Sequence, residues 1–126
     1  MSLTREEADA QLNALAEEQR WDEVLQLCRR MAEELHVPTD IGQVLQHVRV
    51  DTEQLRAEDT GSSLWLLGTM QWGGLGDMAR SNEEALRYFS RAAEKGHLLS
   101  RYRVGFMTAH GQGVVKDEAR GFALMV

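Results

Sequence analysis

Two ten-residue stretches decide how this sequence folds: LGTMQWGGLG at residues 67–76 and VGFMTAHGQG at residues 104–113. When they are aligned without gaps, glycines coincide at three positions and a methionine at a fourth, always 37 residues apart. The matched pairs are Gly68 with Gly105, Met70 with Met107, Gly74 with Gly111, and Gly76 with Gly113. Similarity at a fixed period of this length is typical of repeat architectures.

The glycines also indicate what one repeat looks like. A glycine inside a helix costs about 1 kcal/mol in helix propensity, so Gly68 and Gly105 predict close approach of a neighbouring helix. The Gly-x-Gly that follows tolerates positive φ and lets the chain stop and reverse. A second helix is predicted from Ser81 or Asn82 to Lys95, with Gly96 closing it.

Residues 1–60 carry weaker helix signals. Thr4 and Glu7 have capping-box spacing, and apolar residues then recur at steps of three and four. Asp22 is the expected N-cap of a second helix that ends near Pro38. Thr39 or Asp40 is expected to cap a third helix, from Ile41 to Val48. Two alternatives stay open for Asp51: it continues that helix or caps a separate short turn through Leu55.

A boundary is expected at the polar, turn-rich segment 57–63. Only Gly42 lies in the first 60 residues, whereas the other ten glycines lie in the remaining 66. We therefore expect an N-terminal helical region at 1–60 and two repeat units at 61–126. The second unit is incomplete, because the sequence stops midway through its second helix, which suggests truncation or a covering partner or segment.

Composition narrows the function classes. The chain has 126 residues, 43% of them hydrophobic, and a formal net charge of -6. Residues 1–60 hold 14 acids and 6 bases, a pattern that argues against nucleic-acid binding because phosphates require clustered Lys and Arg. Cys28 is the single cysteine, so no internal disulfide forms and the cytoplasm is favoured. The periplasm is the alternative if a native leader was replaced. No apolar stretch approaches the ~20 residues that span a bilayer.

The repeat resembles the Sel-one-like repeat (SLR) family, a relative of the tetratricopeptide (TPR) repeats. The resemblance covers residues 62–126 and rests on Leu67-Gly68-Thr69-Met70, Gly74-Leu75-Gly76, Arg91-Ala92-Ala93-Glu94-Lys95-Gly96-His97 and Gly111-Gln112-Gly113-Val114-Val115-Lys116-Asp117. The sequence departs from the family where Gln71 and Thr108 replace Tyr and where Gly121 replaces Ala. The resemblance implies an all-α, antiparallel helix-pair solenoid that binds proteins or peptides. Residues 1–60 look like looser, TPR-like helix pairs.

Sequence motifs for catalysis, cofactor binding and metal binding are weaker than the repeat motif. Gly111-x-Gly113 lacks the third glycine of a dinucleotide fingerprint, because Lys116 stands there, and it follows a helix instead of a strand. No nucleophile motif surrounds a serine, and acid pairs adjacent along helices point in different directions. The four histidines, His36, His47, His97 and His110, show no metal-ligand spacing. We therefore expect no enzyme activity, no catalytic residue, no cofactor and no metal.

A partner-binding face is expected on the first helices of the repeats, which line the concave side of such solenoids. The candidate residues are Leu66, Thr69 and Trp72 in the first unit and Arg103 and Phe106 in the second. Arginine mixed with aromatic residues is typical of interface hot spots. The competing interpretation is contact with neighbouring helices. Trp65, Tyr88, Phe89 and Tyr102 stand at core positions of the family.

The leading functional hypothesis is a non-enzymatic scaffold or adaptor for a protein or peptide partner. Three alternatives remain open from the sequence: a bacterial immunity protein that neutralises a toxin, a regulatory repeat region of a larger enzyme, and self-association through the open C-terminal end.

Overall fold

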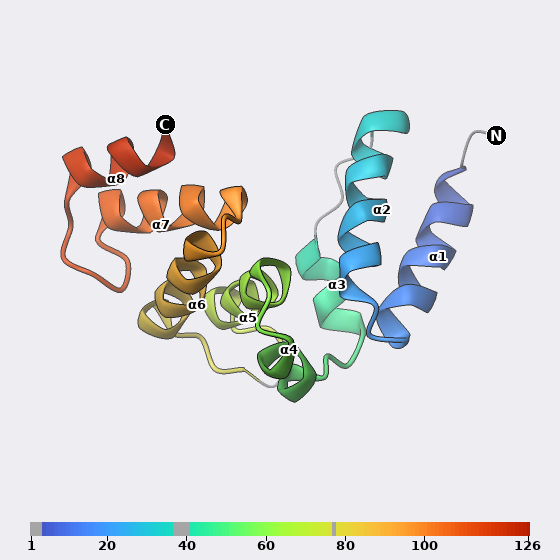
Figure 1. The fold of residues 1–126 in the computed structure, drawn as a ribbon. Helices are drawn as coiled ribbons and strands as arrows, with labels where there is room; N and C mark the ends of the chain where they lie inside the picture. Colours follow the sequence, from blue (N-terminus) through green and yellow to red (C-terminus); the bar gives the residue numbers. More distant parts are fainter. Residues whose placement is uncertain (1–3, 37–40, 77) are drawn as a thin grey trace. The chain divides into compact units, whose positions relative to one another are not determined.

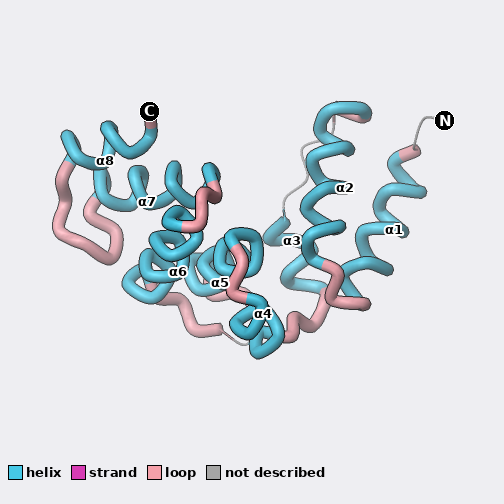
Figure 2. Tube along the Cα trace, viewed as in Figure 1, coloured by secondary structure: helices cyan, strands magenta, loops and turns pink. Residues whose placement is uncertain are grey.

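The computed structural model describes residues 4–36, 41–76 and 78–126, and every regular element in them is a helix (Figure 2). In chain order the helices are α1 (Arg5–Glu17), α2 (Trp21–Glu34), α3 (Ile41–His47), α4 (Thr52–Glu58), α5 (Gly61–Gly73), α6 (Asn82–Glu94), α7 (Leu98–His110) and α8 (Glu118–Met125). The all-α prediction is therefore confirmed. The chain divides into two compact units, Met1–Asp51 and Thr52–Val126.

In the first unit, α1 and α2 pack together through one apolar face of each helix. Thr4 caps α1 as expected, since its hydroxyl accepts a hydrogen bond from the Glu7 N–H at 3.2 Å. The expectation for α2 was wrong: the helix begins at Trp21, and Arg20 occupies the N-cap without a side-chain capping hydrogen bond. Because Trp21 is buried as part of the helix, Asp22 lies inside the first turn, where its charge favours the helix dipole.

Gln19 connects the turn between α1 and α2 to the chain that follows α3. Its amide nitrogen donates to the Arg49 carbonyl at 2.6 Å, and its amide oxygen accepts from the Asp51 N–H at 2.7 Å and from the Trp21 indole at 3.1 Å. The expected caps Thr39 and Asp40 lie outside the described residues. After α3, which ends at His47, the chain forms α4 as a separate helix from Thr52, so the third helix does not continue through Asp51.

The second unit contains the two sequence repeats: α5 with α6, and α7 with α8 (Figure 1). The predicted close approach at the mid-helix glycines is confirmed. A Cβ on Gly68 would lie 2.7 Å from Cε1 of Phe89, and one on Gly105 would lie 2.7 Å from the carbonyl oxygen of Gly121. The second helix of each repeat therefore rests almost directly on the backbone of the first.

Both turns reverse the chain in the same way. Gly74 ends α5 and Gly111 ends α7, each in the left-handed conformation, with φ of 64° and 70°. The next helices start on side-chain caps, where Ser81 accepts from the Glu84 N–H and Asp117 accepts from the Arg120 N–H. Repetition in the sequence therefore corresponds to repetition of turn geometry.

A shared core joins the two repeats. Ala85 and Phe89 of α6 and Met107 of α7 are fully buried together. Four partly buried hydrophobic side chains pack against this core: Trp65, Trp72, Leu86 and Val104. The repeats therefore form one packed block in which α7 lies on α6.

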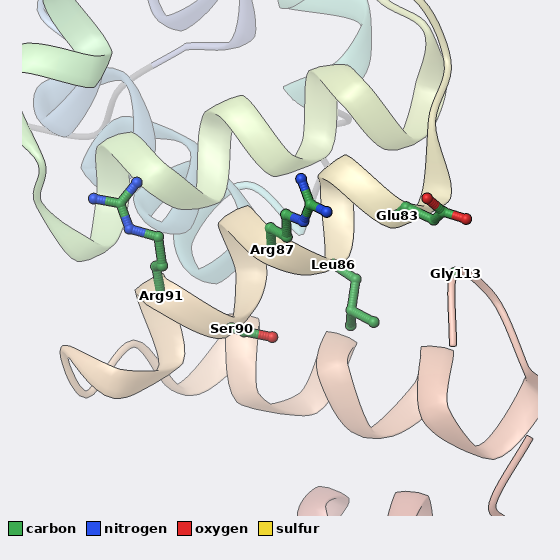
Figure 3. Close-up of a pocket in the computed structure, with 6 residues that line it drawn as sticks. All are labelled: Glu83, Leu86, Arg87, Ser90, Arg91 and Gly113. Carbon is green, nitrogen blue, oxygen red and sulfur yellow. The ribbon is translucent and has the colours of Figure 1, made fainter. Parts of the chain in front are cut away.

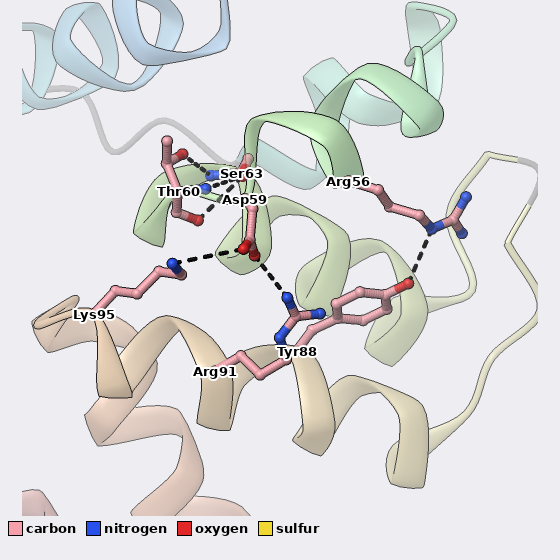
Figure 4. A network of polar contacts seen from close by, with 7 residues as sticks. All are labelled: Arg56, Asp59, Thr60, Ser63, Tyr88, Arg91 and Lys95. Atoms are coloured by element: carbon pink, nitrogen blue, oxygen red, sulfur yellow. Dashed lines mark hydrogen bonds and ion pairs between the residues drawn. The ribbon is translucent and has the colours of Figure 1, made fainter.

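Polar contacts from α4 and from Asp59, the residue that follows it, attach this helix to the first repeat (Figure 4). Arg56 donates to the Tyr88 hydroxyl at 3.1 Å, and Asp59 forms ion pairs with Arg91 at 2.7 Å and Lys95 at 3.7 Å. Leu55 is buried as well. These contacts place α4 in the second unit, so the structural division lies before Thr52, upstream of the boundary expected at residue 60.

Candidate partner-binding face

Helices α5 and α7 hold the candidate residues at equivalent positions of the two repeats. Thr69 and Phe106 are related by the 37-residue period, as are Leu66 and Arg103. Trp72 lies one turn beyond Thr69 on α5. Since these side chains project from helices that pack into a common core, their positions are set by the repeat geometry and not by loops.

Trp72 and Arg103 meet across the two repeats. The guanidinium carbon of Arg103 lies 4.4 Å from the centroid of the Trp72 ring, which is cation–π geometry. The Trp72 indole N–H donates to the Gln112 side-chain oxygen at 3.2 Å. Trp72 is therefore held from both sides by the second repeat.

Arg103 is half-buried, and this burial lowers the pKa of its guanidinium, with a smaller opposing effect from Tyr102. The group stays ionised at neutral pH because an arginine titrates far above it. A positive charge is thus kept at a site where part of its water has been removed.

Phe106 continues the same surface along α7. Its ring stacks on His110, with centroids 4.2 Å apart and planes at 27°, and Nδ1 of His110 lies 2.8 Å from the Phe106 carbonyl oxygen. Phe106 is half-buried and His110 is exposed. We call Thr69, Trp72, Arg103 and Phe106 the partner-binding face, because partner contact is proposed for these four residues below.

Comparison with known proteins identifies the repeat. Residues 61–97 and 98–125 each match the model of the Sel1 repeat, and together the matches span just over half of the chain. The chain belongs to the Sel1 repeat family. Sel1 repeat proteins generally act as protein-interaction scaffolds and are typically non-enzymatic. No curated protein matches the chain.

Two solved structures share the Sel1 fold with this chain. The Sel1 repeat protein from Oxalobacter formigenes aligns with a TM-score of 0.54 and 19% identity, over 91% of this chain and 83% of that one. The cysteine rich protein B of Helicobacter pylori aligns with a TM-score of 0.54 and 16% identity, over 98% of this chain and 88% of that one. At these identities the likeness concerns the helical architecture alone.

The structure changes the membership of the expected site. Leu66 has no exposed surface, so it belongs to the core and cannot touch a partner. Thr69 stays on the face, half-buried, with its hydroxyl donating to the Trp65 carbonyl at 2.8 Å. The helical spacing placed Leu66 correctly on its helix, but only the neighbouring packing determines whether that position reaches solvent.

The aromatic residues expected in the core differ in how deeply they are buried. Phe89 is fully buried and Tyr88 half-buried, whereas Tyr102 is 53% exposed, contrary to expectation. Its equivalent in the first Sel1 unit, Trp65, is partly covered by His97, whose ring centroid lies 5.8 Å away. His97 is the N-cap of α7, so it is the start of the following unit that covers Trp65.

Sequence reasoning missed the partners Gln112 and His110. Gln112 stands at the variable position of the Gly-x-Gly turn, where no pattern marks a hydrogen-bonding role. His110 was considered only as a metal ligand, and the helical step of four from Phe106 was the signal that could have paired them.

A separate cavity of about 530 Å³ lies along α6 (Figure 3). It is lined by Glu83, Leu86, Arg87, Ser90, Arg91 and Gly113. Its two arginines are already paired, Arg87 with Glu84 and Arg91 with Asp59, each at 2.7 Å. Both cations of this cavity therefore already have an acidic partner, unlike Arg103.

Other sites for chemistry are sparse in the part of the chain that the structure describes. No three His, Cys, Asp or Glu side chains there lie close enough together to hold a metal ion. None of the described helices is both long and apolar enough to cross a membrane. Burial raises the pKa of the Cys28 thiol to about 11, which keeps this thiol protonated and unreactive near neutral pH.

Proposed function

We propose that this Sel1 protein is a non-enzymatic scaffold or adaptor that binds a protein or peptide through the partner-binding face. The observation that carries the proposal is the contact between Trp72 and Arg103, which spans both Sel1 units and leaves both side chains half-buried, each with some surface in solvent. Tryptophan and arginine are the residue types most enriched at energetic centres of protein interfaces.

The face is also preorganised. Trp72 is fixed by Arg103 and Gln112, and Phe106 is fixed by its stack on His110. Binding through side chains that are already immobilised avoids about 0.5–1.5 kcal/mol of ordering cost for each side chain. The proposal places the protein in the cytoplasm, because its single cysteine, Cys28, requires no oxidising compartment.

The test is site-specific photo-crosslinking in a lysate of the organism that encodes the chain. A benzoylphenylalanine is placed at exposed His110, beside Phe106, and in a second sample at Val115, which is 87% exposed in the following loop. We expect a discrete protein adduct from position 110 and none from position 115. Added unlabelled protein should suppress the adduct.

The same competition assay measures how much a residue of the partner-binding face contributes to affinity. A hot-spot loss of about 2 kcal/mol corresponds to about thirtyfold in affinity, so Phe106→Ala competitor should be needed at about thirtyfold higher concentration than Val115→Ala competitor. If the two variants compete equally, or if both labelled positions give equal adducts, the protein does not bind its partner through the partner-binding face.

A further inference from the structure

Arg103 differs from every other basic side chain of the chain. All fourteen lysines and arginines lie within the described residues, and Arg103 alone among them is not exposed. Long charged side chains normally keep their heads in water because removing a charge from water is costly. A half-buried guanidinium is therefore expected to have a compensating anion.

In the part of the chain that the structure describes, no acidic side chain pairs with Arg103. Among the described residues its recorded contact is the ring of Trp72, and no carboxylate contributes to the shift of its pKa. Other arginines of the same unit do have such partners, as Arg87 does in Glu84 and Arg91 in Asp59. Within the described residues, the charge of Arg103 thus lies against a π face and has no carboxylate partner.

The composition of the two helices explains why. Helix α5 contains no charged residue, and α7 contains Arg101 and Arg103 but no acid. Residues 61–126 as a whole hold 6 acids and 8 bases, so this half of the chain is slightly positive although the whole chain is acidic. The two helices that make the partner-binding face therefore offer a cation and aromatic rings without an internal anion.

We propose that the partner-binding face recognises an acidic peptide segment, in which an Asp or Glu side chain of the partner pairs with Arg103. This inference rests on the proposed function and names the chemistry of the partner. One face of the guanidinium lies on Trp72, and the N–H groups at its edge match the geometry of a carboxylate. Phe106, one helical turn further along α7, supplies an apolar contact for a residue next to the acid.

The test selects ligands without assuming a partner. A library of random twelve-residue peptides, displayed with no free C-terminus, is selected against the intact protein. Enriched sequences are then synthesised with amidated ends, and their binding is measured by fluorescence polarisation. We expect an Asp or Glu in the enriched sequences, next to an apolar residue.

Paired substitutions connect the acid to Arg103. Changing the peptide acid to its amide should weaken binding to the wild-type protein about tenfold to hundredfold, the range for a hydrogen bond between charged groups. The same change should alter binding to Arg103→Gln less than about threefold, because the pair is already broken. Arg101→Gln is the matched control, since Arg101 is an exposed arginine of the same helix, and it should behave as wild type. Circular dichroism confirms that both variants are folded.

Each contrary outcome has its own meaning. Enriched peptides without acids, equal sensitivity of wild type and Arg103→Gln to the amide change, or binding that requires a free terminal carboxylate would overturn the acidic-segment inference. The proposed function would survive these results if Phe106→Ala still weakened the selected peptides. If no peptide is enriched, the inference fails together with peptide recognition at this face.

Discussion

Replacing Gly113 by alanine should loosen the contact between the second Sel1 unit and the first. Gly113 lies in the loop between α7 and α8 and touches the start of α6. A Cβ there would lie 2.6 Å from the carbonyl oxygen of Asn82, 2.7 Å from its carbonyl carbon and 2.9 Å from the Glu83 nitrogen. All three are backbone atoms of a helix start, so no side-chain rotation can relieve the overlap.

Two costs add at this position. Overpacking of this kind costs about 1–3 kcal/mol. The backbone of Gly113 has a φ of +75°, and an alanine held in the left-handed region costs about another 1–2 kcal/mol. We therefore expect Gly113→Ala to lower the free energy of unfolding by about 2–5 kcal/mol, a large part of what a small domain has.

Gly96 provides a matched control. Its φ is +87°, but a Cβ built there meets nothing within 4 Å. Gly96→Ala therefore has the backbone cost without the steric one and should lose about 1–2 kcal/mol. The difference between the two variants isolates the contact between the loop and α6.

Urea unfolding followed by circular dichroism at 222 nm measures both variants against wild type, with free energies from the midpoint and slope of each transition. The reasoning is refuted if Gly113→Ala loses no more stability than Gly96→Ala. That result would mean that the loop moves away from α6 at negligible cost.

Three further predictions follow from other contacts. Ser63 is buried at the start of α5, and its hydroxyl accepts a hydrogen bond from the Thr60 N–H at 2.8 Å and donates one to the Thr60 carbonyl at 3.1 Å. Ser63→Ala removes both bonds and should cost about 1–2 kcal/mol in thermal unfolding, and an unchanged melting temperature would contradict the cap. The raised pKa of Cys28, about 11 instead of 9.0, predicts slow labelling by a disulfide reagent at pH 8. Because the folded thiol keeps its proton longer than the unfolded one, stability should fall as pH rises from about 9 to about 11, and a Cys28→Ala variant should lose this dependence. Tyr102 on α7 and Phe122 on α8 are more than half exposed, so we expect the protein to self-associate through these helices. The average mass in analytical ultracentrifugation should then increase with protein concentration, and Phe122→Asp should reduce the increase. A constant monomer mass would argue against this self-association.

Turns and helix starts were readable from the sequence because they depend on local chemistry. Gly74 and Gly111 end their helices as the repeated glycines predicted, and Thr4 and Ser81 cap theirs. A position with positive φ or a side-chain cap requires a particular residue type at a fixed distance from the helix end, so it can be recognised from the sequence alone. Asp22 shows the limit, because the burial of Trp21 moved the start of α2 upstream of the apparent cap.

The candidate face was predicted only in part. Helical periodicity placed Thr69, Trp72 and Phe106 on the first helices of the units, as the structure has them. It could not distinguish Leu66, which is fully buried, from its neighbours on the same stripe. Exposure depends on which helix packs against a residue, and that neighbour comes from elsewhere in the chain.

By itself, the sequence determined the family, the helical repeat and the two glycine turns, because a 37-residue period and glycines in register are properties of the order of residues. Only the tertiary structure decided that Arg103 lies on Trp72, that Gln112 holds the indole, and that no carboxylate of the described residues reaches the guanidinium. These relations join residues that lie about one repeat apart in sequence, and they arise when α7 packs onto α6 and brings the two units into register.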